Sequence, residues 1–251
     1  QGWLLNYESW LRAKGNKETT ISIQFRTLRS VYNKAIKRKC VGKEYYPFED
    51  FHINKFNVHT DKRAISKNDV LKIISADLTG KSEYVKFSRD IFVFSYLCGG
   101  INFCDVASLT KENILNGRLS YVRQKTGKQI NLCLTKNASA IIDKYYKGGK
   151  GFLFPILDIT RHITATQKEN RLHKVLGQVD KSLKIVAQIA KVDVNLTTYV
   201  ARHSYATVLK RSGVPTSIIC ESLGHSSERV TQIYLDSFEN EQIDEAMKNL
   251  L

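Results

Sequence analysis

Hydrophobic side chains recur at helical spacing along the first forty residues. The first series predicts a helix over residues 3–13, ended by a Gly-Asn pair, and the second predicts a longer helix from a cap at Thr19 or Thr20 to about Lys39. The first series comprises Trp3, Tyr7, Trp10 and Leu11, and the second comprises Ile21, Phe25, Leu28, Tyr32 and Ile36. Basic residues occupy most of the remaining surface of the second helix, which is therefore amphipathic with a basic outer side.

Periodicity is weak from residue 41 to residue 60, so we expect irregular structure there. It leads into a polar linker, residues 59–65, between a small helical domain, residues 1–58, and a larger domain, residues 66–251. Ser66, with Asp69 three positions later, is typical of a helix start and would open the larger domain.

The larger domain is predicted to be mainly helical around one buried helix. Residues 83–98 are apolar on nearly every face and end at Gly99-Gly100. Two β-rich runs, 118–124 and 129–134, predict a hairpin. Further helices are expected over 105–109, 136–146, 164–190, 198–212 and 215–223, then around Tyr234 and over 239–251. The fold class is therefore mainly α with a small β-sheet or hairpin.

Charge favours a polyanionic partner. The chain has 39 Lys and Arg against 24 Asp and Glu, a net charge of +15. The first sixty residues carry a net positive charge, whereas the last sixteen carry a net negative charge. The two ends are therefore expected to have different roles.

Several classes are disfavoured by the sequence. No apolar run approaches the roughly 18 residues needed to span a bilayer, and no signal peptide opens the chain, so we expect a cytoplasmic protein. The five cysteines lack C-x-x-C spacing, and we expect reduced, mostly buried thiols and no metal site. No phosphate-binding loop is present, and we expect neither a cofactor nor a small-molecule substrate. The chain begins at Gln1 without an initiator Met, which we interpret as a fragment.

Three short patterns occur in order near the end of the chain. The segment 197–207 contains Arg202-His203, Leu223-Gly224-His225 follows, and Tyr234 comes nine residues after His225. This order resembles the catalytic block of tyrosine recombinases and phage integrases, H-x-x-R-H-x-x-A-T, then L-G-H, then a nucleophilic tyrosine. The resemblance runs from about residue 65 to the end, and the preceding basic helices are similar to the family's DNA-binding domain.

The resemblance implies a covalent mechanism. Tyr234 would attack the scissile phosphate and form a 3′-phosphotyrosine, Arg202 would clamp that phosphate and His225 would hydrogen-bond a nonbridging oxygen. Lys125, at the tip of the predicted hairpin, would protonate the leaving 5′-oxygen, with Lys128 as its rival.

Two positions depart from the family pattern. Asn102 stands where the family has its first catalytic arginine, and Arg123 is a candidate substitute because alternate strand residues share a face, which would put it beside Lys125. Tyr199 stands where histidine is common, three residues before Arg202. A neutral tyrosine can hydrogen-bond, but it is a poor proton acceptor at pH 7.

The expected partner is double-stranded DNA, and the candidate contacts are Arg26, Arg29, Lys37, Arg38 and Lys128. The resemblance also implies a tetramer on DNA, assembled through the acidic C-terminal helix, residues 239–251, although packing of this helix on its own domain is equally expected. A bacterial or phage mobile element is the expected source. Two alternatives remain open: a non-catalytic DNA-binding protein that keeps the fold, and a nicking or relaxing enzyme of the topoisomerase type.

Overall fold

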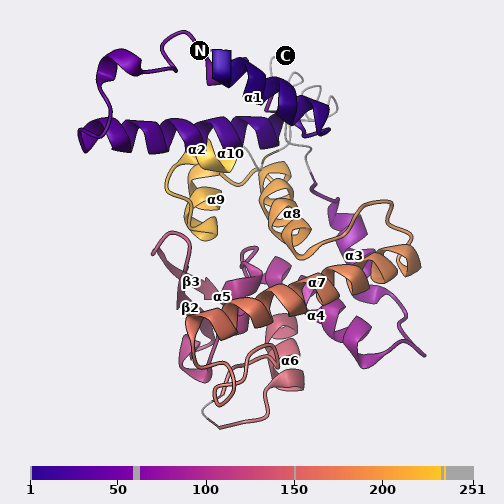
Figure 1. The fold of residues 1–251 in the computed structure, drawn as a ribbon. Helices are drawn as coiled ribbons and strands as arrows, with labels where there is room; N and C mark the ends of the chain where they lie inside the picture. The colour runs from indigo at the N-terminus through magenta and orange to yellow at the C-terminus, as the bar shows by residue number, and fades with distance from the viewer. Residues whose placement is uncertain (1, 59–62, 150, 233–234, 236–251) are drawn as a thin grey trace, which may run out of the picture. The chain divides into compact units, whose positions relative to one another are not determined.

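The chain forms two compact units, residues 1–61 and 62–251 (Figure 1). The computed structural model describes residues 2–58, 63–149, 151–232 and 235. Tyr234, the predicted C-terminal helix and part of the predicted linker lie outside the described residues. Each unit contains its own buried hydrophobic residues, so each is described by itself.

The N-terminal unit packs two helices against an irregular segment that contains two short 3₁₀ turns. Its elements are α1 (Gly2–Ala13), α2 (Glu18–Lys37), η1 (Lys43–Tyr45) and η2 (Ile53–Lys55). Phe25, fully buried on α2, stacks on Phe51 and Phe56 with ring centroids 4.7 Å and 5.4 Å apart. Aromatic packing thus fixes the irregular segment against the apolar face of α2.

The predicted cap of α2 was wrong. The amide of Ile21 bonds to the carbonyl of Lys17, so the helix begins at Glu18, and Thr19 and Thr20 already lie in its first turn. The helix ends at Lys37, because Lys39 adopts a left-handed backbone conformation with φ 58°.

The C-terminal unit is built around α4 (Glu83–Leu97), which is buried along most of its length as predicted. It contacts α3 (Lys67–Ser75), α6 (Lys136–Tyr145), α7 (Ala165–Ile189) and α8 (Thr198–Arg211). Ser66 caps α3 by accepting a 3.1 Å hydrogen bond from the amide of Asp69, which confirms that helix start.

A three-stranded antiparallel sheet, in the order β1-β2-β3, follows α5 (Phe103–Ser108) and η3 (Lys111–Asn113). Its strands are β1 (Ile114–Leu115), β2 (Arg118–Val122) and β3 (Gln129–Cys133). Tyr121 pairs with Ile130, and both side chains are buried. Strand β2 ends two residues before its predicted end, so Arg123 and Gln124 belong to the turn.

Two short helices, α9 (Thr216–Leu223) and α10 (Glu228–Gln232), pack on each other, and α9 also contacts α8 and β3. The loop between α9 and α10 therefore begins next to the sheet and next to α8, the helix that carries Arg202. This arrangement, visible in Figure 1, brings three separate parts of the sequence together.

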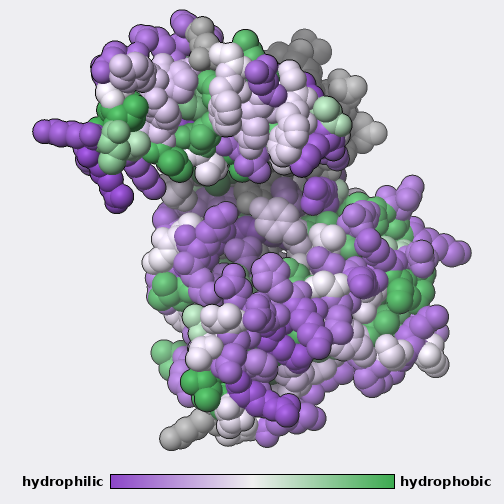
Figure 2. All heavy atoms as spheres, viewed as in Figure 1, coloured by the Kyte–Doolittle hydropathy of each residue, from purple (hydrophilic) through white to green (hydrophobic). Residues whose placement is uncertain are grey.

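The prediction that most cysteines are buried was wrong. Cys98 and Cys220 are buried, Cys104 is half-buried, and Cys40 and Cys133 are exposed; all five are free thiols. Among the described helices, none is both long and apolar enough to cross a membrane. Figure 2 shows hydrophilic residues over much of the visible surface of both units, with hydrophobic residues scattered among them.

Candidate active site

The loop after α9 is where three of the predicted catalytic residues meet. Gly224 ends α9 in the left-handed conformation, with φ 62°, and His225 follows it. Arg202 comes to this loop from α8, and Arg123 comes from the end of β2. The structure thus assembles Arg202, His225 and Arg123 around the backbone of residues 223–225.

Arg202 is a buried cation held by main-chain oxygens. Only 2% of its surface is exposed. One terminal nitrogen donates to the carbonyl of Gly100 at 2.9 Å, and the other donates to the carbonyl of Leu223. These two bonds fix the plane of the guanidinium group, which suits it to bidentate binding of a phosphate.

Gly100 is required for this approach. A Cβ atom at position 100 would lie 2.6 Å from the Cα of Arg202, closer than real side chains allow. The backbone there also has φ 63°. The turn at Gly99-Gly100, where α4 was predicted to end, therefore places a carbonyl oxygen directly beside the guanidinium group of Arg202.

His225 lies in positively charged surroundings. Its side chain is buried, and burial, followed by the charges of Arg202, Arg123, Lys125 and Lys128, lowers the pKa of His225 to about 3. The ring is therefore neutral near pH 7. Its Nδ1 atom lies 2.9 Å from the hydroxyl oxygen of Thr231 in α10.

The hairpin turn contributes to the same site. The amide of Arg123 donates to the carbonyl of Lys128 at 2.8 Å, and its guanidinium group donates to the carbonyl of Gly224 at 2.8 Å. The hydroxyl of Thr126 donates to the same Gly224 oxygen at 3.1 Å. Lys128 donates to the carbonyl of His225, while Lys125 is exposed in the turn.

Arg123 therefore reaches the site by a different route from the one that the strand pattern predicted. The alternation argument assumed that Arg123 and Lys125 share a strand face. The strand ends at Val122, Arg123 turns inward with 4% of its surface exposed, and Lys125 remains exposed. Arg123 and Lys125 are related through a turn, not through a shared strand face.

Asn102 and Asp105 lie at the start of α5. Asn102 is the N-cap residue, without a side-chain cap bond, and its carbonyl accepts from the amide of Val106. It is two residues from Gly100, the partner of Arg202. The 3% exposed side chain of Asp105 accepts from the amide of Gln124 at 3.0 Å and fixes the hairpin turn.

Sequence reasoning assigned no role to Asp105. Burial raises the pKa of its carboxyl group, although the nearby charges of Arg123 and Arg202 act in the opposite direction. The available signal was a carboxylate three residues after Asn102, at the start of a short helix. Asp105 is thus a buried carboxyl group that is electrostatically coupled to both arginines.

Tyr199 lies in the first turn of α8 and is 41% exposed. Its ring packs edge-on against His203, with the ring centroids 4.9 Å apart. His203 itself is buried. Tyr199 lies one helical turn before Arg202, at the exposed end of α8.

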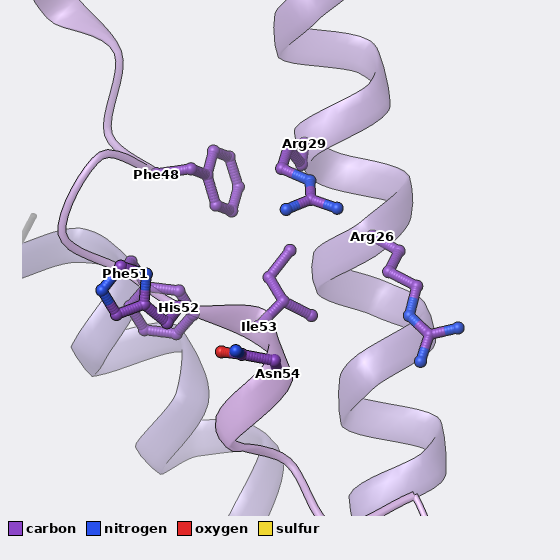
Figure 3. Close-up of a pocket in the computed structure, with 7 residues that line it drawn as sticks. All are labelled: Arg26, Arg29, Phe48, Phe51, His52, Ile53 and Asn54. Carbon is purple, nitrogen blue, oxygen red and sulfur yellow. The ribbon is translucent and has the colours of Figure 1, made fainter.

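The predicted DNA-binding residues of α2 lie in the other unit. Arg26 and Arg29 line a hollow of about 370 Å³ between α2 and the segment 48–54 (Figure 3). Phe48, Ile53, His52 and Asn54 also line it. Lys37 lines a second hollow along the same helix, and Arg38 is exposed at the end of the helix.

No group of three or more His, Cys, Asp or Glu side chains gathers as a potential metal site within the described ranges of the chain. The donors assembled around residues 223–225 are instead guanidinium, imidazole, amine and hydroxyl groups. Such donors bind and stabilise a phosphate group directly.

The fold is that of an integrase-type catalytic domain with a small helical N-terminal domain. The Tn1549 transposon integrase, solved in complex with circular intermediate DNA, superposes with a TM-score of 0.67 over 100% of this chain and 86% of its own, at 16% identity. A lambda integrase dimer bound to a COC′ core site gives 0.66 over 94% and 82%, at 15% identity.

The phage integrase family model matches residues 63–241, and the phage integrase SAM-like domain model matches residues 1–57. The chain therefore belongs to the phage integrase family. It is a site-specific DNA recombinase of the tyrosine class, an enzyme that cleaves and rejoins DNA strands.

Curated relatives agree with this class. Tyrosine recombinase XerD of Halalkalibacterium halodurans is 24% identical over 92% of this chain and 75% of its own length. Tyrosine recombinase XerA of Pyrococcus horikoshii is 26% identical over 76% of this chain and 65% of its own length.

Proposed function

We propose that this enzyme breaks double-stranded DNA by attack of the Tyr234 hydroxyl on a scissile phosphate. The tyrosine becomes joined to the 3′-phosphate, the 5′-oxygen leaves, and a 5′-hydroxyl later reverses the step to rejoin the strand. The observation that supports this proposal best is the convergence of Arg202, His225 and Arg123 on residues 223–225, nine residues before the predicted nucleophile.

The other predicted site residues would bind the scissile phosphate or stabilise its charge. Arg202 clamps the phosphate, and His225 hydrogen-bonds a nonbridging oxygen. Arg123 supplies the positive charge that Asn102 lacks, because it is buried against the same loop and its Nε atom has no hydrogen-bond partner among the described residues. Asn102 and Tyr199 contribute neutral hydrogen bonds.

Lys125 is the proposed acid for the leaving 5′-oxygen. It is exposed in the turn, yet close enough to His225 to influence its pKa. Lys128, the rival, is engaged with the carbonyl of His225 and is better placed to hold the hairpin against the loop. Its contact with DNA remains a secondary proposal.

We propose that the basic side of α2 contacts the DNA backbone through Arg26, Arg29, Lys37 and Arg38. All four are exposed, and Arg26 and Arg29 border both hollows along α2. A lambda integrase tetramer has been solved on a Holliday junction, and its fold matches this chain with a TM-score of 0.64. A homotetramer on DNA, joined through residues 239–251, is the assembly that we propose.

The domain limits that we propose are residues 1–58, 59–65 and 66–251. The biological role that we propose is integration or excision of a mobile element, in the cytoplasm of a bacterium. The transposon integrase with the same fold supports this role by analogy of fold.

A nicked suicide substrate tests the covalent step. Because a cleaved strand with a nick near the crossover loses its 5′-hydroxyl by diffusion, the protein–DNA adduct accumulates and survives denaturation. We expect the adduct with the wild type and none with Tyr234→Phe. Tyr146→Phe, which removes a hydroxyl bonded to the carbonyl of Gly149, is the matched control and should retain it.

The result also separates the alternatives. Site-specific binding without any adduct would support the non-catalytic DNA-binding protein. An adduct without strand exchange between two marked duplexes would support the nicking or relaxing enzyme. An adduct with exchange is the expected result.

A substrate with sulfur in place of the 5′-bridging oxygen tests the acid. A thiolate leaves without protonation, so the sulfur substrate should restore cleavage by Lys125→Ala to near the wild-type rate. Lys128→Ala should lose activity equally on both substrates. Rescue of Lys128→Ala instead would transfer the role to Lys128.

A further inference from the structure

The hydroxyl of Thr231 determines how the ring of His225 can act. Thr231 is completely buried in α10, and its hydroxyl oxygen lies 2.9 Å from Nδ1 of His225. In the described part of the chain, this ring nitrogen is the sole hydrogen-bond partner of that hydroxyl. A buried hydroxyl hydrogen without an acceptor is costly, so the hydroxyl donates to Nδ1.

The direction of this bond fixes the position of the ring proton. Burial and the surrounding cations Arg202, Arg123, Lys125 and Lys128 keep the ring of His225 neutral near pH 7. A neutral imidazole carries one proton, and a ring whose Nδ1 accepts a hydrogen bond carries it on Nε2. His225 is then a donor at Nε2, as a partner of an anionic phosphate oxygen must be.

We propose that Thr231 is a positioning residue that holds His225 as the Nε2–H tautomer and does so only while helix α10 is packed in place. Residue 231 is three positions before Tyr234, so the segment that leads to the nucleophile also orients the histidine. Displacement of α10 would therefore break the bond that orients His225 and shift the segment that leads to Tyr234. This inference rests on the proposed role of His225 in binding the scissile phosphate.

The packing around the bond supports this coupling. The amide of His225 donates to the carbonyl of Cys220 at 3.1 Å, and the amide of Val230 donates to the carbonyl of Ser227 at 3.2 Å. These main-chain bonds fix the two ends of the loop between α9 and α10. The side-chain bond between His225 and Thr231 closes that loop, so its geometry depends on where α10 lies.

The tautomer can be measured directly in the intact protein. With ¹⁵N-labelled histidine, long-range ¹H–¹⁵N correlations distinguish the two neutral tautomers and the imidazolium, and His225→Gln assigns the signal. We expect the Nε2–H pattern in the wild type and in Thr231→Ser, which keeps the hydroxyl. Thr231→Val, which keeps the shape, should show a mixture of tautomers.

Cleavage should follow the same order. On the nicked substrate, we expect Thr231→Val to cleave about 10-fold more slowly, the scale of one lost hydrogen bond, and Thr231→Ser to stay within about 3-fold of the wild type. DNA affinity should be unchanged. Ser88→Ala removes another buried hydroxyl, bonded to the carbonyl of Tyr84 at 2.7 Å, and controls for a loss of stability alone.

The outcomes are distinguishable. An Nδ1–H pattern or an imidazolium in the wild type would overturn the proposal, as would a Thr231→Val protein with unchanged tautomer and rate. A slow Thr231→Val with an unchanged Nε2–H pattern would also overturn it. If the wild type forms no adduct at all, the proposed function fails, while the spectra still decide the tautomer.

Discussion

Arg123 and Arg202 are two guanidinium groups buried in one site, and both donate to main-chain carbonyl oxygens. Carbonyl oxygens satisfy donors without neutralising charge, so these bonds leave the positive charge of both buried groups in place. The carboxyl group of Asp105 offsets only part of this positive charge, because burial raises its pKa and so disfavours the carboxylate form. An incoming phosphate would complete this charge balance.

Arg123→Ala is therefore expected to slow covalent adduct formation by about 100-fold, the scale of losing one preorganised charge-stabilising donor. Arg118→Ala is the matched control: Arg118 lies in the same hairpin but is exposed and bonded to the side chain of Asn131 at 2.6 Å. It should remain within about 2-fold of the wild type. Equal rates for the two variants would remove Arg123 from the site chemistry.

The depressed pKa of His225 predicts a pH dependence of stability. Its pKa falls from an ordinary value of 6.5 to about 3 on folding, so the folded state resists protonation. Its contribution to stability is complete above pH 6.5 and is lost as the pH falls towards 3. Between pH 6.5 and pH 4.5 the loss should approach about 1.4 kcal/mol per pH unit.

The difference between wild type and His225→Gln isolates this contribution, because the other histidines are common to both proteins. Urea unfolding at several pH values gives the free energies. We expect the wild type to lose more stability than the variant on acidification. Parallel curves would show that His225 titrates normally in the folded protein.

Between elements, the closest approach is that of the turn after α4 to α8, at Gly100 and Arg202. Gly100→Ala should cost the left-handed backbone penalty, about 1–2 kcal/mol, and about 1–3 kcal/mol more for the collision with the backbone of α8. Gly80→Ala is the control, since Gly80 has φ 74° and open space around its Cα. It should cost the backbone penalty alone.

Unfolding free energies in urea measure both variants. The difference between them, about 1–3 kcal/mol, reports the contact between the two elements. Gly100→Ala should also lose adduct formation, because Arg202 must move to relieve the collision. Similar stabilities for both alanine variants would mean that the turn and α8 can separate without cost.

The elements themselves were largely predictable, because apolar periodicity and caps are local signals. The buried helix α4 and the Ser66 cap both follow from neighbouring residues. The inward turn of Arg123 was not predictable, because it depends on where β2 stops and on the Gly224 carbonyl, 101 residues away in sequence. The Thr231 contact likewise exists only because α9 and α10 pack on each other.

The sequence predicted which residues belong to the candidate site better than it predicted how they are arranged. Motif spacing singled out Arg202 and His225, and the structure brings them to one loop. The same spacing says nothing about which oxygens hold Arg202, or that Asp105 fixes the hairpin. Those contacts join segments that are distant in the chain, so no local pattern encodes them.

At the scale of the whole molecule, the net charge of +15 favours binding to any nucleic acid, and only part of it can contribute to a specific complex. Several basic side chains are paired with carboxylates. Lys72 bonds to Asp69 and Lys86 bonds to Glu83, so their charges are locally compensated. Arg26 and Arg29 instead are exposed and line two neighbouring hollows along α2.

The salt dependence of DNA binding separates these two kinds of charge. Each phosphate contact contributes about 0.9 to the slope of log affinity against log salt, so Arg26→Ala with Arg29→Ala should lower the steepness by about 2. Lys72→Ala with Lys86→Ala removes the same number of positive charges and should leave the slope nearly unchanged. Fluorescence anisotropy with duplex DNA from about 50 to 200 mM salt measures both. If the two double variants lowered the slope equally, net charge alone would govern binding, and the basic side of α2 would not be a specific DNA contact.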